Sequence, residues 1–66
     1  MEKAKHVILD ILQKAGGGET YQSELVRQSG FSRSRVSEVL SSLEEDGLIS
    51  RIPLGKNFRV ISTKQM

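Results

Sequence analysis

The chain has 66 residues, no cysteine and a net charge of +2, so we expect one small domain that is held together without disulfides. No apolar run approaches the roughly 20 residues of a membrane span, and the first residues are too charged for a signal peptide. These features exclude a membrane-spanning protein, and we expect a soluble, cytoplasmic one. The net charge is too small to indicate a partner by itself.

The first predicted element is an amphipathic helix over residues 2–15. Its apolar side chains recur at helical spacing and are Val7, Ile8, Ile11 and Leu12. The chain has no second histidine and no cysteine, so we expect His6 to be a surface residue rather than a metal ligand. Three glycines at 16–18 end the helix in a turn, and they lack the lysine and hydroxyl of a phosphate-binding loop.

A short second helix is predicted over residues 22–29, with Thr20 or Tyr21 leading into it and Gly30 stopping it. We expect the Tyr21 ring to be partly buried by packing rather than to stack on a base. Only three residues separate this helix from the next one. Two helices joined by so short a turn that contains glycine form the helix-turn-helix pattern.

The third helix, over about 32–46, has two contrasting faces. Its apolar face, which should pack into the core, consists of Val36, Val39, Leu40 and Leu43. The opposite face is mostly short and polar and consists of Ser34, Ser37, Glu38 and Ser41. Ser32 is the expected N-cap and Gly47 the expected left-handed residue that ends the helix. Short side chains on the free face allow the helix to approach a groove closely.

The amino end of this third helix is predicted to be electropositive. Arg33 and Arg35 flank the free face in its first turn, where the helix dipole also favours an anion. Either arginine could donate to phosphate or guanine, and Glu38 could accept a hydrogen bond from cytosine although it would repel phosphates. The acidic run at 44–46 lies at the other end, and we expect it to be distant from any polyanion.

After Gly47 the pattern becomes that of a β-hairpin, with strands at 48–54 and 58–62 and a turn at 55–57. Pro53 cannot donate to a ladder, so it should lie on an edge or near the turn. We expect Phe58 and Val60 to face inward, Arg59 to face outward and residues 63–66 to form a frayed tail. From Gly47 onward the chain has no acidic residue, and its basic residues are Arg51, Lys56, Arg59 and Lys64.

Residues 24–51, ELVRQSGFSRSRVSEVLSSLEEDGLISR, resemble the winged helix-turn-helix domain, in particular the MarR-like and related archaeal transcriptional regulators. The resemblance extends over residues 2–63. It implies a mostly α, α+β fold with three helices and a C-terminal β-hairpin wing, as a single domain over 1–66. It also implies a nucleoid-associated regulator that places the third helix in the major groove of double-stranded DNA and the wing on the adjacent backbone.

The resemblance and the charge pattern together predict ten DNA-contacting residues. They are Arg33, Ser34, Arg35, Ser37, Glu38, Ser41, Arg51, Lys56, Asn57 and Arg59. MarR proteins dimerise through additional terminal helices, for which this chain has no residues. We therefore expect either a homodimer through the first helix or the hairpin, or a module that acts as a monomer or within a longer protein.

The sequence does not predict an enzyme. With one histidine, no cysteine and no carboxylates expected to share a pocket, no nucleophile and base can be paired, and we expect no cofactor or metal. The alternative to a DNA-binding regulator is a winged-helix module that docks on another protein in a larger assembly. Glu38 and the modest net charge favour that module, whereas the basic residues favour DNA.

Overall fold

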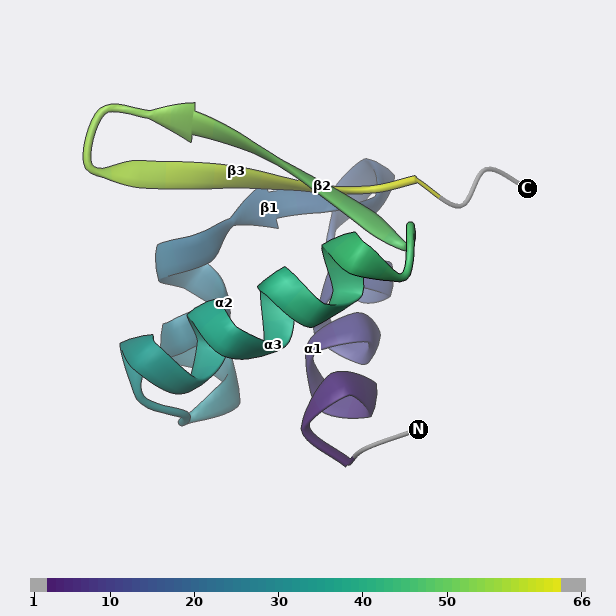
Figure 1. The fold of residues 1–66 in the computed structure, drawn as a ribbon, viewed down its shortest axis with the longest axis vertical. Coiled ribbons are helices and arrows are strands. Elements are labelled where there is room, and N and C mark those ends of the chain that lie inside the picture. Colours follow the sequence, from purple (N-terminus) through teal and green to yellow (C-terminus); the bar gives the residue numbers. More distant parts are fainter. Residues whose placement is uncertain (1–2, 64–66) are drawn as a thin grey trace.

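The computed structural model describes residues 3–63, in which three helices lie beneath a small antiparallel sheet (Figure 1). The elements in chain order are α1 (Lys3–Lys14), a 3-10 turn (Gly16–Gly18), β1 (Glu19–Tyr21), α2 (Gln22–Ser29), α3 (Arg33–Glu45), β2 (Ile49–Leu54) and β3 (Asn57–Ser62). The predicted fold class is thereby confirmed. Among the described residues, no helix is both long and apolar enough to span a membrane.

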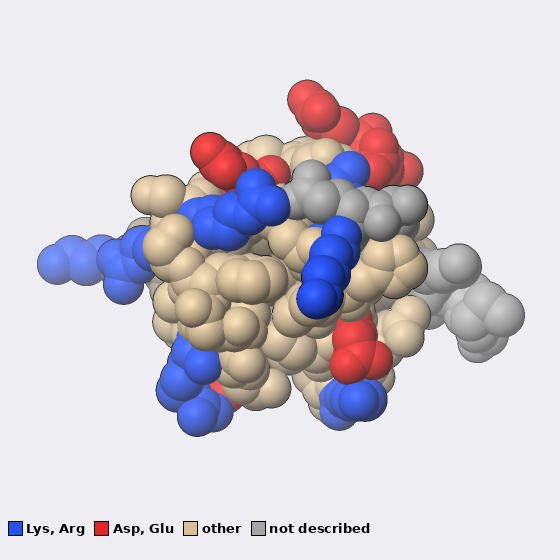
Figure 2. Space-filling view, turned by 90° about the horizontal axis from the view of Figure 1, so that it is seen from below, with Lys and Arg blue, Asp and Glu red and all other residues tan. Residues whose placement is uncertain are grey.

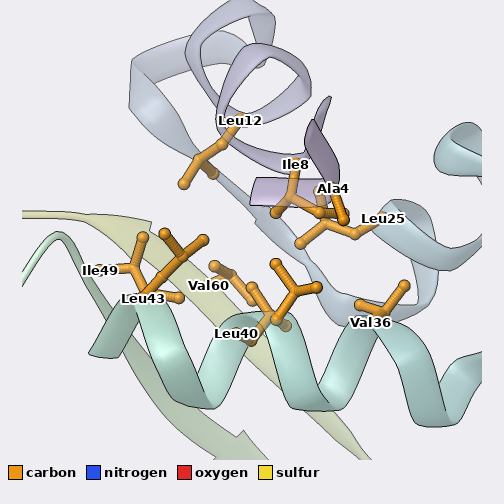
Figure 3. Close-up of a cluster of buried hydrophobic side chains, with 10 residues drawn as sticks. Ala4, Ile8, Leu12, Leu25, Val36, Leu40, Leu43, Ile49 and Val60 are labelled. Atoms are coloured by element: carbon orange, nitrogen blue, oxygen red, sulfur yellow. The ribbon is translucent and has the colours of Figure 1, made fainter. Parts of the chain in front are cut away.

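The core forms where the apolar faces of the helices meet the inner face of the sheet (Figure 3). The predicted apolar face of α3 is confirmed, because Val36, Val39, Leu40 and Leu43 are all buried. The predicted stripe on α1 is partly wrong. Its buried residues are Ala4, Ile8 and Leu12, whereas Val7 and Ile11 are only half-buried. The small Ala4 side chain permits close packing there, which a search for large apolar residues overlooks.

Both predicted ends of α3 are confirmed. The Ser32 hydroxyl accepts a hydrogen bond from the Arg35 amide at 3.1 Å, and Ser32 is therefore the N-cap. At the other end Gly47 has a φ of 75°. Its amide donates to the Glu44 carbonyl at 2.9 Å, and the next amide, that of Leu48, donates to the Leu43 carbonyl at 3.0 Å. These two bonds form a Schellman motif, which turns the chain from α3 into β2.

The sheet contains a strand that the sequence did not reveal. β1 pairs with β3 in antiparallel register, so the strand order is β1-β3-β2 and β3 is central. Tyr21, at the end of β1, lies opposite Arg59 on the outer face of the sheet and is 51% exposed. The prediction that its ring is partly buried by packing is therefore wrong. Tyr21 does precede α2 as expected, but its side chain makes no capping hydrogen bond.

The hairpin of β2 and β3 is confirmed with a shorter turn than predicted. Leu54 pairs with Asn57, so Asn57 belongs to β3 and only Gly55 and Lys56 form the turn. Gly55 has a φ of 62°, and no described non-glycine residue has a positive φ. This pattern matches a type II′ turn, which needs a positive φ at its first central residue alone.

The faces of the hairpin agree with the sequence, but its carboxyl end does not. Val60 is buried, Phe58 is half-buried and Arg59 is exposed, as expected. Pro53 lies in β2, which is an edge strand. Thr63 is not frayed, because its amide donates to the Leu48 carbonyl at 3.1 Å and its hydroxyl to the Gly47 carbonyl at 2.5 Å. The rest of the predicted tail, residues 64–66, lies outside the described residues.

Candidate nucleic-acid interface

The free face of α3 is accessible over most of its length. Ser34, Glu38 and Ser41 are exposed, and Ser37 is half-buried. Arg33 and Arg35 in the first turn are also exposed. In Figure 1 this helix lies at the front of the molecule, with its first turn on the same side as the turn of the hairpin. The predicted arrangement of small polar side chains between two arginines is therefore present on the surface.

A hollow of about 280 Å³ joins the beginning of α3 to the hairpin. Its lining residues come from α2, α3 and the hairpin and are Gln22, Ser23, Val26, Arg33, Lys56, Asn57 and Phe58. Within residues 3–63, neither Arg33 nor Lys56 forms an ion pair. Gln22 and Ser23 are the first residues of α2, so the amino ends of two helices border the hollow. The two cations and the two positive dipole ends together make this region attractive to an anion.

The acidic residues at the end of α3 are separated from this hollow. The 13 residues of α3 place its two ends roughly 18 Å apart. Glu44 pairs with Arg51 at 2.9 Å, and Asp46 pairs with Lys5 at 3.4 Å. Seen from below, basic side chains project on the left, where α3 begins, and the largest acidic group lies at the upper right (Figure 2). The predicted separation between a basic beginning and an acidic end of the third helix is thus present in the folded chain.

Two further arginines are paired with neighbours on their own helices. Arg35 lies 3.6 Å from the Glu38 carboxylate, one turn along α3. On α2, Arg27 pairs with Glu24, and hydrogen bonds from Arg27 and then Gln28 lower the pKa of the Glu24 carboxyl. Because one member of each pair, Arg27 or Glu38, is largely exposed to solvent, these ion pairs add little stability. Each carboxylate nevertheless partly neutralises its arginine.

The sequence predicts that Arg51 and Arg59 contact DNA, but neither is among the residues that line the hollow with Arg33. Arg59 lies on the outer face of the sheet, where its Nε donates to Glu19 at 2.6 Å. Arg51 lies on the inner face, its side chain is only 15% exposed, and its Nη2 donates to the Ser41 hydroxyl at 3.0 Å. The Ser41 hydroxyl thus also forms a hydrogen bond within the protein.

Asn57 binds α2 rather than projecting from the turn of the hairpin. Its Oδ1 accepts a hydrogen bond from the Ser23 amide at 3.2 Å, and its Nδ2 donates to the Ser23 hydroxyl at 3.0 Å. The Ser23 amide is one of the orphan donors at the start of a helix. Since Tyr21 provides no side-chain cap, Asn57 caps α2 from a distant strand. The sequence could not reveal this cap, because the two residues are 34 positions apart.

We expect Asn57→Ala to lower the free energy of unfolding by about 0.5–2 kcal/mol, the usual cost of losing a helix cap. Asn57→Asp is the matched control, because a carboxylate still accepts from the Ser23 amide and interacts favourably with the positive end of the helix. Urea unfolding followed by circular dichroism measures both changes. Equal stability of wild type and Asn57→Ala would show that the cap contributes nothing.

Three helices in a helix-turn-helix arrangement, followed by a β-hairpin beside the third helix, define a winged-helix domain. The chain belongs to the family described as Domain of unknown function (DUF7343), whose profile matches residues 1–63. It is 35% identical over 65 residues to uncharacterized proteins from Pyrococcus horikoshii and Pyrococcus abyssi. The aligned region is 98% of this chain but 19% of each relative, so the chain spans about a fifth of their length.

Solved structures with the same fold include MarR-family transcriptional regulators. One from Streptomyces coelicolor, determined in complex with DNA, has a TM-score of 0.87 and 23% identity, over 96% of this chain and 42% of that one. AbsC from the same organism has a TM-score of 0.87 and 21% identity, over 97% of this chain and 45% of that one. The predicted MarR-like winged-helix fold is thereby confirmed.

Proposed function

We propose that the chain is a double-stranded DNA-binding transcriptional regulator, with α3 in the major groove and the turn of the hairpin on the adjacent backbone. The observation that carries this proposal is the shared hollow of Arg33 and Lys56 between the amino ends of α2 and α3. Unpaired cations beside helix amino ends are suited to phosphate. The similar S. coelicolor regulator was determined in complex with DNA, which supports DNA binding by a domain of this fold.

The contacts divide by chemistry. Arg33 and Lys56 bind backbone phosphates, because both line the hollow and neither has a carboxylate partner among residues 3–63. Ser34, Ser37 and Glu38 lie on the free face of α3, where they reach base edges. Arg35 flanks that face and reaches phosphate or guanine once DNA competes with Glu38 for its guanidinium.

The proposed interface leaves out four of the residues that the sequence suggested. The side chains of Ser41, Arg51, Asn57 and Arg59 already form hydrogen bonds within the protein. A phosphate would have to displace those bonds, and Arg59 also faces away from α3. A homodimer through α1 or the hairpin stays a prediction, as does association with the nucleoid.

The test is a titration of mixed-sequence duplex DNA at several salt concentrations, followed by fluorescence anisotropy. Two phosphate contacts predict a slope of about −1.8 for the logarithm of affinity against the logarithm of salt concentration, and each further contact adds about −0.9. A single strand of the same length is the control, because it cannot present a major groove. No binding to the duplex at low salt would contradict the proposal.

That negative result would favour the alternative function, a module that docks on another protein. The exposed large apolar side chains of the described residues are Tyr21, Ile52 and Leu54. The strand register places all three on the outer face of the sheet, on the side opposite to Val60. A DNA-binding surface on α3 does not use this face.

A further inference from the structure

The Arg51 side chain connects the hairpin to both helices of the helix-turn-helix. Its Nε donates to the Glu44 carboxylate at 2.9 Å and its Nη2 to the Ser41 hydroxyl at 3.0 Å, both on α3. Its Nη1 donates to the Gln22 side chain on α2 at 3.4 Å. The guanidinium also lies over the Phe58 ring of β3, 5.2 Å from the ring centre. One side chain on β2 thus contacts three other elements.

The chemistry of these contacts is suited to fixing the angle between the hairpin and α3. A guanidinium is a planar fork, so hydrogen bonds from three of its nitrogens define both its position and its orientation. Gln22, one of its acceptors, is only 8% exposed and is the buried polar residue of the described core. Glu44 lies in the last turn of α3, where the helix dipole disfavours a carboxylate, and Arg51 compensates for that charge.

We propose that Arg51 is a positioning residue that sets the orientation of the hairpin relative to α3, and that it does not itself contact DNA. This inference rests on the proposed function. The turn at Gly55 lies four positions after Arg51, a distance of roughly 13 Å along the strand. A rotation of about 20° at Arg51 would therefore move Lys56 by roughly 5 Å, more than the length of a hydrogen bond. Arg51 therefore positions Lys56 from the base of the hairpin, together with Asn57, whose hydrogen bonds to Ser23 hold the tip beside α2.

A double-mutant cycle with Lys56 distinguishes positioning from direct contact. We expect Arg51→Met to weaken duplex binding about as much as Lys56→Met does, roughly tenfold, because it acts by displacing Lys56. The double variant should then bind no more weakly than Lys56→Met alone. If Arg51 contacted a phosphate, the two losses would multiply and each would reduce the salt slope by about 0.9. That additive result would overturn the inference.

Glu44→Gln provides a second test, in which the two explanations predict opposite signs. Removing a carboxylate from a DNA-binding protein ordinarily strengthens binding by reducing repulsion. Loss of the Glu44–Arg51 pair should instead weaken binding several-fold if the pair positions the hairpin. Glu45→Gln is the matched control, because Glu45 is exposed on the same turn and Arg51 pairs with Glu44. Tighter binding by both variants would overturn the inference.

The orientation of the hairpin can also be measured without DNA, which separates this inference from the proposed function. Residual dipolar couplings of backbone amides report the orientation of β2 and β3 relative to α3 in the free protein. We expect Arg51→Met and the milder Arg51→Lys to change these couplings while the couplings within α3 stay constant. Unchanged couplings in both variants would overturn the positioning role. Failure of the wild type to bind duplex DNA would overturn the proposed function instead.

Discussion

Leu40→Ala should lower the free energy of unfolding by about 2–5 kcal/mol, the range for truncating a buried leucine. The Leu40 side chain is fully buried on the middle turn of α3 and packs in the cluster with Leu25, Leu43 and Val60. A domain of this size has a stability of only a few kcal/mol, so most of the variant should be unfolded at 37 °C. Thermal and urea unfolding followed by circular dichroism measure this effect.

Ser34→Ala is the matched control for Leu40→Ala, because Ser34 is exposed on the opposite face of the same helix. Its stability should stay within about 0.5 kcal/mol of the wild-type value. A Leu40→Ala protein that unfolds cooperatively at the wild-type midpoint would contradict the packing of α3 against the core. The proposed interface depends on that packing, because it determines which face of α3 is free.

Replacing both Arg33 and Lys56 with glutamine should reduce duplex affinity about a hundredfold or more in low salt, since each lost phosphate contact costs roughly tenfold or more. The salt slope should also become shallower by about 1.8. Both side chains are exposed and form no ion pair within residues 3–63, so the melting temperature should hardly change. The single variants should each show about half of the change in slope.

Lys14→Gln is the control for net charge. Lys14 is an exposed cation near the end of α1, where it pairs with Asp10 at 3.1 Å and lies outside the hollow. Its loss changes the net charge as much as either single interface variant does. If Lys14→Gln weakened binding as much as Arg33→Gln, the attraction would be a property of the overall charge, and the hollow would not be a specific phosphate site.

Features that depend on nearby residues could be predicted from the sequence. The buried face of α3 follows from apolar spacing over two turns, and its ends follow from Ser32 and Gly47. The hairpin follows from the change to an extended pattern after Gly47. In each case the residues that determine the structure are within a few positions of one another, so their chemical types are sufficient.

Features that depend on distant residues could not be predicted. β1 has only three residues, too few for a recognisable alternation, and its partner β3 lies about 40 positions further along the chain. A sequence shows that Arg51 is basic, but not that Glu44, Ser41 and Gln22 surround it. For the same reason the sequence predicts Asn57 in the turn, whereas in the structure it belongs to β3 and caps α2. These tertiary contacts decide whether a polar side chain forms hydrogen bonds within the protein or is free to contact a ligand.

Pro53 has a consequence for how copies of this domain meet. In a hairpin closed by the pair Leu54 and Asn57, alternate residues direct their backbone groups outward, and Pro53 is among them. The exposed border of β2 therefore lacks an amide where an incoming strand would seek one. Fusion of two hairpins into a continuous sheet would leave that strand's carbonyl unsatisfied. Two copies of the domain on neighbouring sites can therefore contact each other without their β2 strands joining into one continuous sheet.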